Sequence, residues 1–148
     1  MNILIINGPN LNLLGIREPN IYKSNSYNDL INYVNSISNN LGISIDMVQT
    51  NHEGAIIDYL HSTLTKKYDG VIINPGAYTH YSYAIRDAIS SINVPTIEVH
   101  LTDITKREKW RSVSVISEVC LKTFMGHHFE SYKDAINYLV QERGQYAK

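Results

Sequence analysis

Short runs of consecutive apolar residues alternate along this chain with longer segments in which apolar residues recur every three or four positions. Two of the runs, Ile3 to Ile6 and Gly70 to Ile73, are followed at once by a polar turn that contains Asn, Pro and Gly. This pattern is typical of strands buried on both faces of a sheet. Three further strands are predicted at Ile43 to Gln49, at Val94 to Val99 and within Val119 to Met125.

Four segments have the apolar spacing of amphipathic helices. The first starts at a capping signal, Ser26 with Asp29 three residues later, and its pattern stops at Gly42. The second and third segments are Glu53 to Leu64 and Ser82 to Ile92. The last is Tyr132 to about Glu142, and Ser131 is its predicted cap. The second and third helices are predicted to direct inward Ile56, Ile57, Leu60, Leu64, Tyr83, Ile85, Ala88, Ile89 and Ile92.

Strands that alternate with helices of roughly 10 to 15 residues indicate right-handed βαβ units. The predicted fold is therefore a single α/β domain over residues 1–148, a flavodoxin-like, doubly wound, five-stranded parallel sheet with helices on both faces. In such sheets ligands bind beyond the carboxyl ends of the strands, near the point where the strand order reverses. Three polar loops are expected there: Asn7 to Ser26, Asn74 to Tyr81 and His100 to Arg111.

The composition narrows the function classes. The 148 residues are 43% hydrophobic and 18% charged, and the net charge is -1 with the basic residues spread along the chain. A nucleic-acid partner is not expected, because such proteins cluster their basic residues. Cys120 is the single cysteine, which suits a reducing compartment, and Met1 to Ile6 is too short an apolar stretch for a signal peptide or membrane span. A cytoplasmic location without membrane attachment is expected.

Several familiar α/β sites do not match the sequence. The first loop has neither a Walker A lysine nor the three-glycine dinucleotide pattern, and no Gly-x-Ser-x-Gly elbow occurs. Cys120 lies in an apolar run without an activating partner nearby in sequence. His127 and His128 are adjacent, whereas metal ligands need wider spacing and more members, so a metal site is not expected there.

Acid and base side chains remain as candidates on the three loops. A tyrosine such as Tyr22 acts as a base near neutral pH only when a cation or hydrogen bonds stabilise its phenolate, and Arg17 lies five residues upstream. On spacing alone, a packed Tyr22 beside a solvated Arg17 is the favoured interpretation. Glu98 and His100 share one face of an extended strand, so the carboxylate can orient the imidazole. The full candidate set is Arg17, Tyr22, His80, Glu98, His100, Arg107 and Arg111.

Six blocks of sequence in the same order resemble the type II 3-dehydroquinate dehydratases, shikimate-pathway enzymes of aromatic amino-acid biosynthesis that convert 3-dehydroquinate to 3-dehydroshikimate. The resemblance covers most of the chain. The blocks are Ile6 to Gly15 (INGPNLNLLG), Arg17 to Pro19 with Tyr22, Asn51 to Gly54 (NHEG), Asn74 to His80 (NPGAYTH), Arg86 to Ala88, and Glu98 to Leu101 (EVHL).

The resemblance implies a role for each catalytic position. Tyr22 would remove a proton next to the substrate ketone, and Arg17 would lower its pKa. Asn12 would hold a water molecule that stabilises the enolate. His100, oriented by Glu98, would protonate the departing hydroxyl group in an anti elimination. The resemblance further implies that Arg17 to Tyr22 forms a mobile lid.

The resemblance also implies a set of substrate contacts. Asn74 and the backbone N–H groups of Leu101 and Thr102 would bind the substrate carboxylate. His80 and Arg111 would hold ring hydroxyl groups. No metal, nucleotide or lysine imine is needed for the implied reaction, so no cofactor is expected.

One implied contact comes from another copy of the chain. In the family an aspartate of a neighbouring subunit completes the site, here Asp87, and the assembly is a homododecamer of four trimers.

Three departures from the family pattern stand out. Lys23 follows Tyr22 where glycine is common, and Asp103 replaces a frequent asparagine after the carboxylate-binding turn. The segment Ser112 to Phe129 matches least well. Lys23 and Asp103 are the features that favour the rival interpretation, a non-catalytic binding module that keeps the scaffold and has lost turnover.

Overall fold

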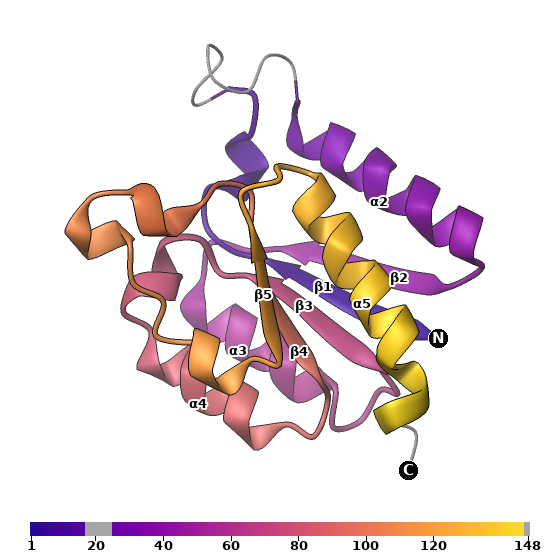
Figure 1. The fold of residues 1–148 in the computed structure, drawn as a ribbon. Helices are drawn as coiled ribbons and strands as arrows, with labels where there is room; N and C mark the ends of the chain where they lie inside the picture. The colour runs from indigo at the N-terminus through magenta and orange to yellow at the C-terminus, as the bar shows by residue number, and fades with distance from the viewer. Residues whose placement is uncertain (17–24, 147–148) are drawn as a thin grey trace.

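A parallel sheet forms the centre of the molecule, as the apolar runs predict (Figure 1). This computed structural model describes residues 1–16 and 25–146, with side chains as far as residue 143. Within these ranges the sheet has five strands in the order β2-β1-β3-β4-β5, all parallel. The order matches the flavodoxin-like doubly wound topology. The strands are β1 (Asn2–Asn7), β2 (Ser44–Gln49), β3 (Gly70–Asn74), β4 (Thr96–His100) and β5 (Lys122–Met125).

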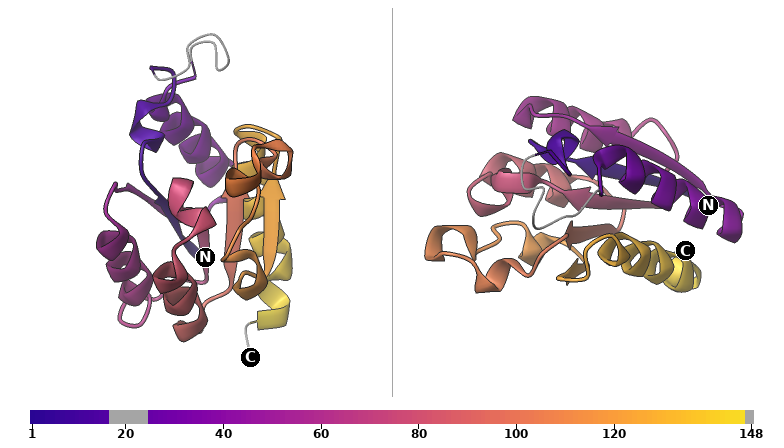
Figure 2. Two further views of the ribbon diagram at one scale, coloured as in Figure 1. Left: turned by 90° about the vertical axis from the view of Figure 1, so that its left-hand side faces the viewer. Right: turned by 90° about the horizontal axis from the view of Figure 1, so that it is seen from above.

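Helices cover both faces of the sheet, which confirms the predicted fold class (Figures 1 and 2). One face packs against α2 (Tyr27–Leu41) and α5 (Glu130–Tyr146), and the other against α3 (Glu53–Ser62) and α4 (Tyr83–Ser91). Side chains alternate between the two faces along each strand. Ile3, Ile5 and Ile72 therefore belong to the first core, whereas Leu4, Ile6, Val71 and Ile73 belong to the second.

The start of α2 confirms the predicted capping signal. The Asp29 N–H donates to the Ser26 hydroxyl at 3.1 Å, and the Ser26 N–H donates to the Asp29 carboxylate at 2.8 Å. The helix ends at Gly42, whose φ of 64° is a left-handed conformation that glycine adopts without steric cost.

The ends of the other helices correct three predictions. Leu64 was expected inward on α3, but this helix ends at Ser62 and a turn leaves Leu64 65% exposed. Tyr83 was also expected inward, but it is the first residue after the Ser82 cap and is 66% exposed. Ser131 does not cap α5, because turn bonds from 130 to 127 and from 131 to 128 start the helix at Glu130.

Two tight turns join the carboxyl ends of β1 and β3. The Gly8 N–H donates to the Asn74 carbonyl at 2.7 Å, and a Cβ on Gly8 would lie 2.5 Å from the backbone of Pro75. Gly76 has a φ of 59°, and a Cβ there would lie 2.9 Å from the Pro9 carbonyl oxygen. Only glycine lets the two backbones come so close, because any side chain would overlap the facing turn. These contacts therefore hold the loop after β1 against the loop after β3.

Short 3-10 segments shape the loops beyond these strand ends. They are η1 (Leu11–Leu13), η2 (Gly76–His80), η3 (Ile104–Lys106), η4 (Lys109–Arg111) and η5 (Ser117–Val119). Among the helices of the described ranges, none combines the length and the apolar character needed to cross a membrane.

The contact between these turns can be tested by unfolding. Gly8→Ala is expected to destabilise the fold by about 2 kcal/mol or more, because the methyl group would overlap backbone atoms of Pro75. Urea unfolding measures the loss. Gly54→Ala is the matched control, since Gly54 lies in the first turn of α3 with nothing within 4 Å of its added Cβ, and a gain of up to about 1 kcal/mol is expected. Equal unfolding midpoints for the two variants would show that the turns tolerate a side chain.

Candidate active site

A cavity of about 220 Å³ lies at the carboxyl ends of the strands, between the three loops that the sequence pattern placed there. Its walls come from residues 9–15 after β1, from 74–80 after β3 and from 100–111 after β4. Among the residues expected to form a site, those that line it are Asn74, His80, His100, Leu101, Thr102, Arg107 and Arg111.

Glu98 and His100 form a buried pair at the end of β4. Their side chains lie on the same side of the strand, and the His100 Nε2 is 2.7 Å from the Glu98 Oε1. Glu98 is 0% exposed and His100 is 5% exposed, but His100 reaches the cavity wall. This contact confirms the predicted pairing. Because an ionised carboxylate only accepts hydrogen bonds, Nε2 carries a proton and Nδ1 is the ring nitrogen free to meet a bound molecule.

Three hydroxyl groups also donate to the Glu98 carboxylate. Ser114 donates to Oε1 at 2.6 Å, Ser117 donates to Oε2 at 2.6 Å, and Thr123 donates to Oε2 at 3.1 Å. Burial by itself raises the pKa of Glu98, but the bonds from His100, Ser114 and Ser117 outweigh it and leave the pKa below its ordinary value of 4.5. The site therefore keeps a negative charge next to His100.

The sequence interpretation missed these three donors. They lie 16, 19 and 25 residues from Glu98, in the segment that resembles the family least. Thr123 is the register partner of Glu98 on β5, Ser114 lies in the loop before η5, and Ser117 is the first residue of η5. The pairing of β4 with β5 is the one feature from which a donor could have been predicted, because it sets Thr123 beside Glu98.

Asn74 lines the cavity from the end of β3 and is only 4% exposed. Its Nδ2 donates to the hydroxyl group of Tyr132 at 3.1 Å, and its Oδ1 accepts from the Gly76 N–H at 3.3 Å. Leu101 and Thr102 continue the chain directly after His100 and line the same cavity. The predicted carboxylate contacts are thus neighbours of the Glu98–His100 pair.

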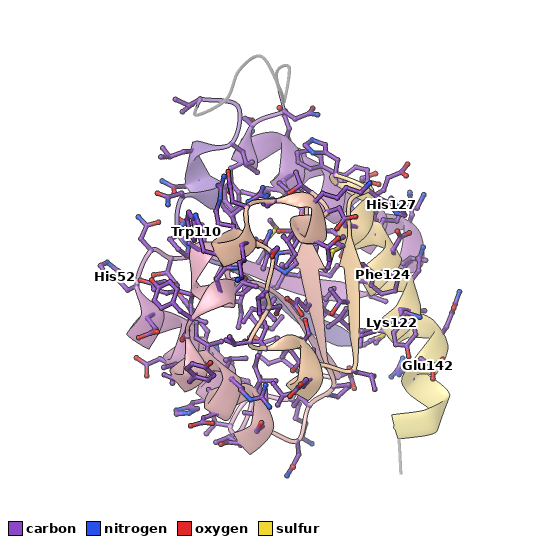
Figure 3. The ribbon with its side chains drawn as sticks, turned by 60° about the vertical axis from the view of Figure 1, so that its left-hand side comes forward. His52, Trp110, Lys122, Phe124, His127 and Glu142 are labelled. Carbon is purple, nitrogen blue, oxygen red and sulfur yellow. The ribbon has the colours of Figure 1, made fainter. Side chains whose placement is uncertain are left out.

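His80 and Arg111 form the outer wall of the cavity with Trp110. The His80 Nδ1 is 2.7 Å from the Val113 carbonyl oxygen, and its ring meets the Trp110 ring edge-on at 6.2 Å. The Arg111 guanidinium lies 5.2 Å from the centre of the Trp110 ring and binds the Glu108 carboxylate through Nε and Nη2 at 2.6 and 2.9 Å. Trp110, which had no predicted role, projects from η4 (Figure 3) and contacts both side chains.

The family model described as Dehydroquinase class II matches residues 1–140 of the chain. The chain belongs to this family. Named relatives agree: a 3-dehydroquinate dehydratase from Caldicellulosiruptor saccharolyticus is 52% identical over 140 residues, which cover 95% of this chain and 96% of the relative. Another from Clostridium perfringens strain SM101 is 50% identical over 139 residues, covering 94% and 95% of the two chains.

Solved structures of the family have the same fold. The type II dehydroquinase of Butyrivibrio crossotus matches with a TM-score of 0.91 and 48% identity, over 94% of this chain and 97% of that one. The type II dehydroquinase of Propionibacterium acnes matches with a TM-score of 0.86 and 33% identity, over 95% and 98%. The family predicted from six short motifs is confirmed over nearly the whole chain.

Asn12, to which the resemblance assigns a bound water molecule, does not line the cavity. Asn12 is exposed on η1 and is absent from the cavity lining, whereas Asn10 lines it. Asn10 has a φ of 68°, and its N–H donates to the Asn51 side-chain oxygen at 3.1 Å. The left-handed turn at Asn10 directs the chain so that residue 10, rather than residue 12, faces the cavity.

Two aspartates of this family member also lie outside the cavity lining. Asp87 is exposed on α4. Asp103 accepts from the Thr105 N–H at 3.0 Å and from the Thr105 hydroxyl at 2.5 Å, so it caps η3. These bonds lower the pKa of Asp103. The Asp103 carboxylate, which replaces the asparagine frequent in the family, is therefore bonded within its own loop and does not line the cavity.

Arg17, Tyr22 and Lys23 lie outside the described residues, and so does the predicted lid from Arg17 to Tyr22. Their roles stay predictions.

The two adjacent histidines have separate partners. The His127 Nδ1 is 3.1 Å from the Asp134 carboxylate, and the His128 Nε2 is 3.1 Å from the Asn25 side-chain nitrogen. His127 lies at the end of β5, far from Trp110 in the view of Figure 3. In the part of the chain that the structure describes, no three metal-ligating side chains are grouped.

The charge of Glu98 makes stability depend on pH. A lowered folded-state pKa stabilises the fold above about pH 4.5, and this stability is lost as the pH falls through the folded-state pKa. Ser117→Ala removes a donor and raises that pKa toward the unfolded-state value, so the stability lost on acidification is expected to be smaller and to be fully lost at a higher pH. Unfolding free energies measured from neutral pH downward detect the change.

Ser112→Ala provides the control for this experiment, because the Ser112 hydroxyl donates to the Lys109 carbonyl and not to Glu98. Its pH profile is expected to follow that of the unmodified protein. Parallel profiles for Ser117→Ala and Ser112→Ala would contradict the role assigned to Ser117.

Proposed function

We propose that this chain catalyses the dehydration of 3-dehydroquinate to 3-dehydroshikimate by anti elimination through an enolate, as a step of the shikimate pathway. The observation that carries the proposal is the buried Glu98–His100 pair at the cavity, in a chain whose relatives are named 3-dehydroquinate dehydratases. A proton donor held by a buried carboxylate is what the loss of a hydroxyl group from a small substrate requires.

The proposed reaction has two steps. Tyr22, as its phenolate, takes a proton from the carbon next to the ketone, and the C–H electron pair forms an enolate. Arg17 stabilises the phenolate. The enolate then re-forms the ketone as the C–O bond breaks. His100, protonated on both ring nitrogens, keeps its Nε2 proton on Glu98 and donates its Nδ1 proton to the departing hydroxyl group, which leaves as water. No oxidation or reduction occurs, so acid and base side chains suffice and no cofactor is proposed.

Stabilisation of the enolate oxygen is expected to be the largest contribution to the rate. The sequence pattern assigned the water-holding role to Asn12, but the cavity geometry favours Asn10, and we assign the role to Asn10. Proton transfer by Tyr22 and His100 adds a factor of about 10² to 10⁴ for each residue.

The proposed substrate contacts follow the cavity wall. Asn74 and the N–H groups of Leu101 and Thr102 bind the carboxylate, and His80 and Arg111 hold ring hydroxyl groups. All five residues line the cavity, next to His100. We place the reaction in the cytoplasm, since Cys120 is the single cysteine and the sequence therefore offers no internal disulfide bond, which suits a reducing compartment.

Asp87 is proposed to reach the site of a neighbouring copy in a homododecamer of four trimers. It is exposed on α4 and does not line the cavity of its own chain. Tyr81 and Tyr83 on the same segment are 60% and 66% exposed, which gives this face apolar area that a second copy can cover.

Turnover of 3-dehydroquinate tests the proposed function. The purified protein is expected to generate the ultraviolet absorbance of a conjugated enone. Tyr22→Phe, Arg17→Ala and His100→Asn are each expected to lower kcat by about 10²-fold or more. His61→Asn is the control, because His61 is exposed on α3 outside the cavity, and it should keep full activity. Folded protein that is stabilised by the substrate but forms no enone would support the non-catalytic binding module.

Subunit mixing tests the shared site. Asp87→Asn and His100→Asn are expected to be nearly inactive as separate proteins. When they are unfolded together and refolded, about a quarter of the sites combine an intact His100 with an intact Asp87 from the neighbour. The enone-forming activity of the refolded mixture should therefore rise above that of either variant alone. If the mixture remains as inactive as its two components refolded alone, Asp87 does not act across an interface.

A further inference from the structure

A buried tyrosine hydroxyl group lies between two strand-end amides beneath the cavity. Tyr132 of α5 is 0% exposed. Its hydroxyl donates to the Asn7 Oδ1 at 2.6 Å and accepts from the Asn74 Nδ2 at 3.1 Å. Asn74 lines the cavity, whereas Asn7 is fully buried and does not. Tyr132 therefore contacts a residue of the site without reaching the cavity itself.

The register of the sheet explains this arrangement. Asn7 and Asn74 are paired positions at the carboxyl ends of β1 and β3. They follow Ile5 and Ile72 on the face that α5 covers (Figure 1). An apolar residue at position 132 would leave an amide oxygen and an amide N–H buried without partners, which is costly. A tyrosine hydroxyl can satisfy both, since it donates one hydrogen bond and accepts another.

The direction of each bond in this network is determined. The Asn7 Oδ1 faces Tyr132 and takes the single Tyr132 proton, while the Asn7 Nδ2 faces the Tyr27 hydroxyl at 3.5 Å. Tyr132 can then only accept from Asn74. The Gly76 N–H independently requires the Asn74 oxygen on the other side. Both constraints select the same orientation of the Asn74 amide, and its second Nδ2 proton is left for a ligand in the cavity.

This orientation matters for a negatively charged ligand. A carboxylate accepts hydrogen bonds and is repelled by an amide oxygen. If the Asn74 amide were turned over, its oxygen would take the place of the donor. Burial raises the pKa of Tyr132, so its hydroxyl stays protonated and the direction of the network does not change at alkaline pH.

We infer that Tyr132 is a positioning residue: with Asn7, it fixes the Asn74 amide in the orientation that donates to the substrate carboxylate. The inference rests on the proposed function, because it assigns a cause to the carboxylate contact of that same site.

Tyr132→Phe tests the inference through substrate binding. The KM for 3-dehydroquinate is expected to rise about tenfold while kcat changes much less, because the lost hydroxyl loosens a binding contact and leaves the His100 side of the site intact. Asn7→Ala is the second variant, which keeps the Tyr132 hydroxyl but frees its proton to turn toward Asn74. Each variant is assayed well below its own unfolding midpoint.

Tyr33→Phe is the matched control. It deletes a tyrosine hydroxyl on α2, where the ring contacts Phe129 at 5.8 Å rather than a residue of the cavity. Its KM is expected to remain unchanged. An equal rise in KM for Tyr33→Phe would mean that the effect comes from general loosening of the core.

A pair of competing ligands separates orientation from stability. Quinate carries a carboxylate and quinamide carries a neutral amide in its place. The unmodified protein is expected to favour quinate, and Tyr132→Phe to lose this preference by about tenfold. Equal weakening of both ligands, or an unchanged KM in both folded variants, would overturn the inference. Failure of the proposed function would appear differently, as the absence of turnover in the unmodified protein.

Discussion

Buried polar side chains at the carboxyl edge of the sheet must have hydrogen-bond partners, and this requirement ties the surrounding elements together. The Glu98 carboxylate takes donors from its own strand, from the loop before η5, from η5 itself and from β5. Asn7 and Asn74 share the Tyr132 hydroxyl of α5. Since an unpaired buried polar group costs free energy, the bonds that hold the site also hold the fold. Site and scaffold are therefore stabilised by the same contacts.

The two sides of the cavity come from opposite layers of the molecule. Glu98 and His100 alternate with Ile97 and Val99, so they lie on the face of α3 and α4. Asn74 follows Ile72 on the face of α2 and α5. The cavity lies beyond the strand ends, where neither layer of helices intervenes. In the proposed reaction, a proton donor from one layer thus acts on a substrate whose carboxylate is held by the other.

Local sequence signals predicted most of the fold, and the motifs predicted the family. The apolar runs and the Ser26 capping box depend on neighbours in sequence, and they were identified correctly. Helix ends were less predictable, as Leu64 and Tyr83 show, because apolar spacing does not say where a helix stops. The donors to Glu98 and the Asn7–Tyr132 bond were missed, because a tertiary contact between residues as far as 125 positions apart leaves no periodic pattern. The presence of Asn10 rather than Asn12 in the cavity wall follows a left-handed turn that the sequence pattern did not predict.

The alternation of side chains also limits how this chain can change in length. A single-residue insertion or deletion inside β4 would rotate every later position of the strand to the opposite face. After an insertion ahead of Glu98, Val99 would take the place of His100, and the Glu98 charge would enter the apolar layer beneath α5. The residue composition would hardly differ, yet both the stability and the chemistry would be lost. A change in chain length within this strand is therefore expected to be far more damaging than one in a loop.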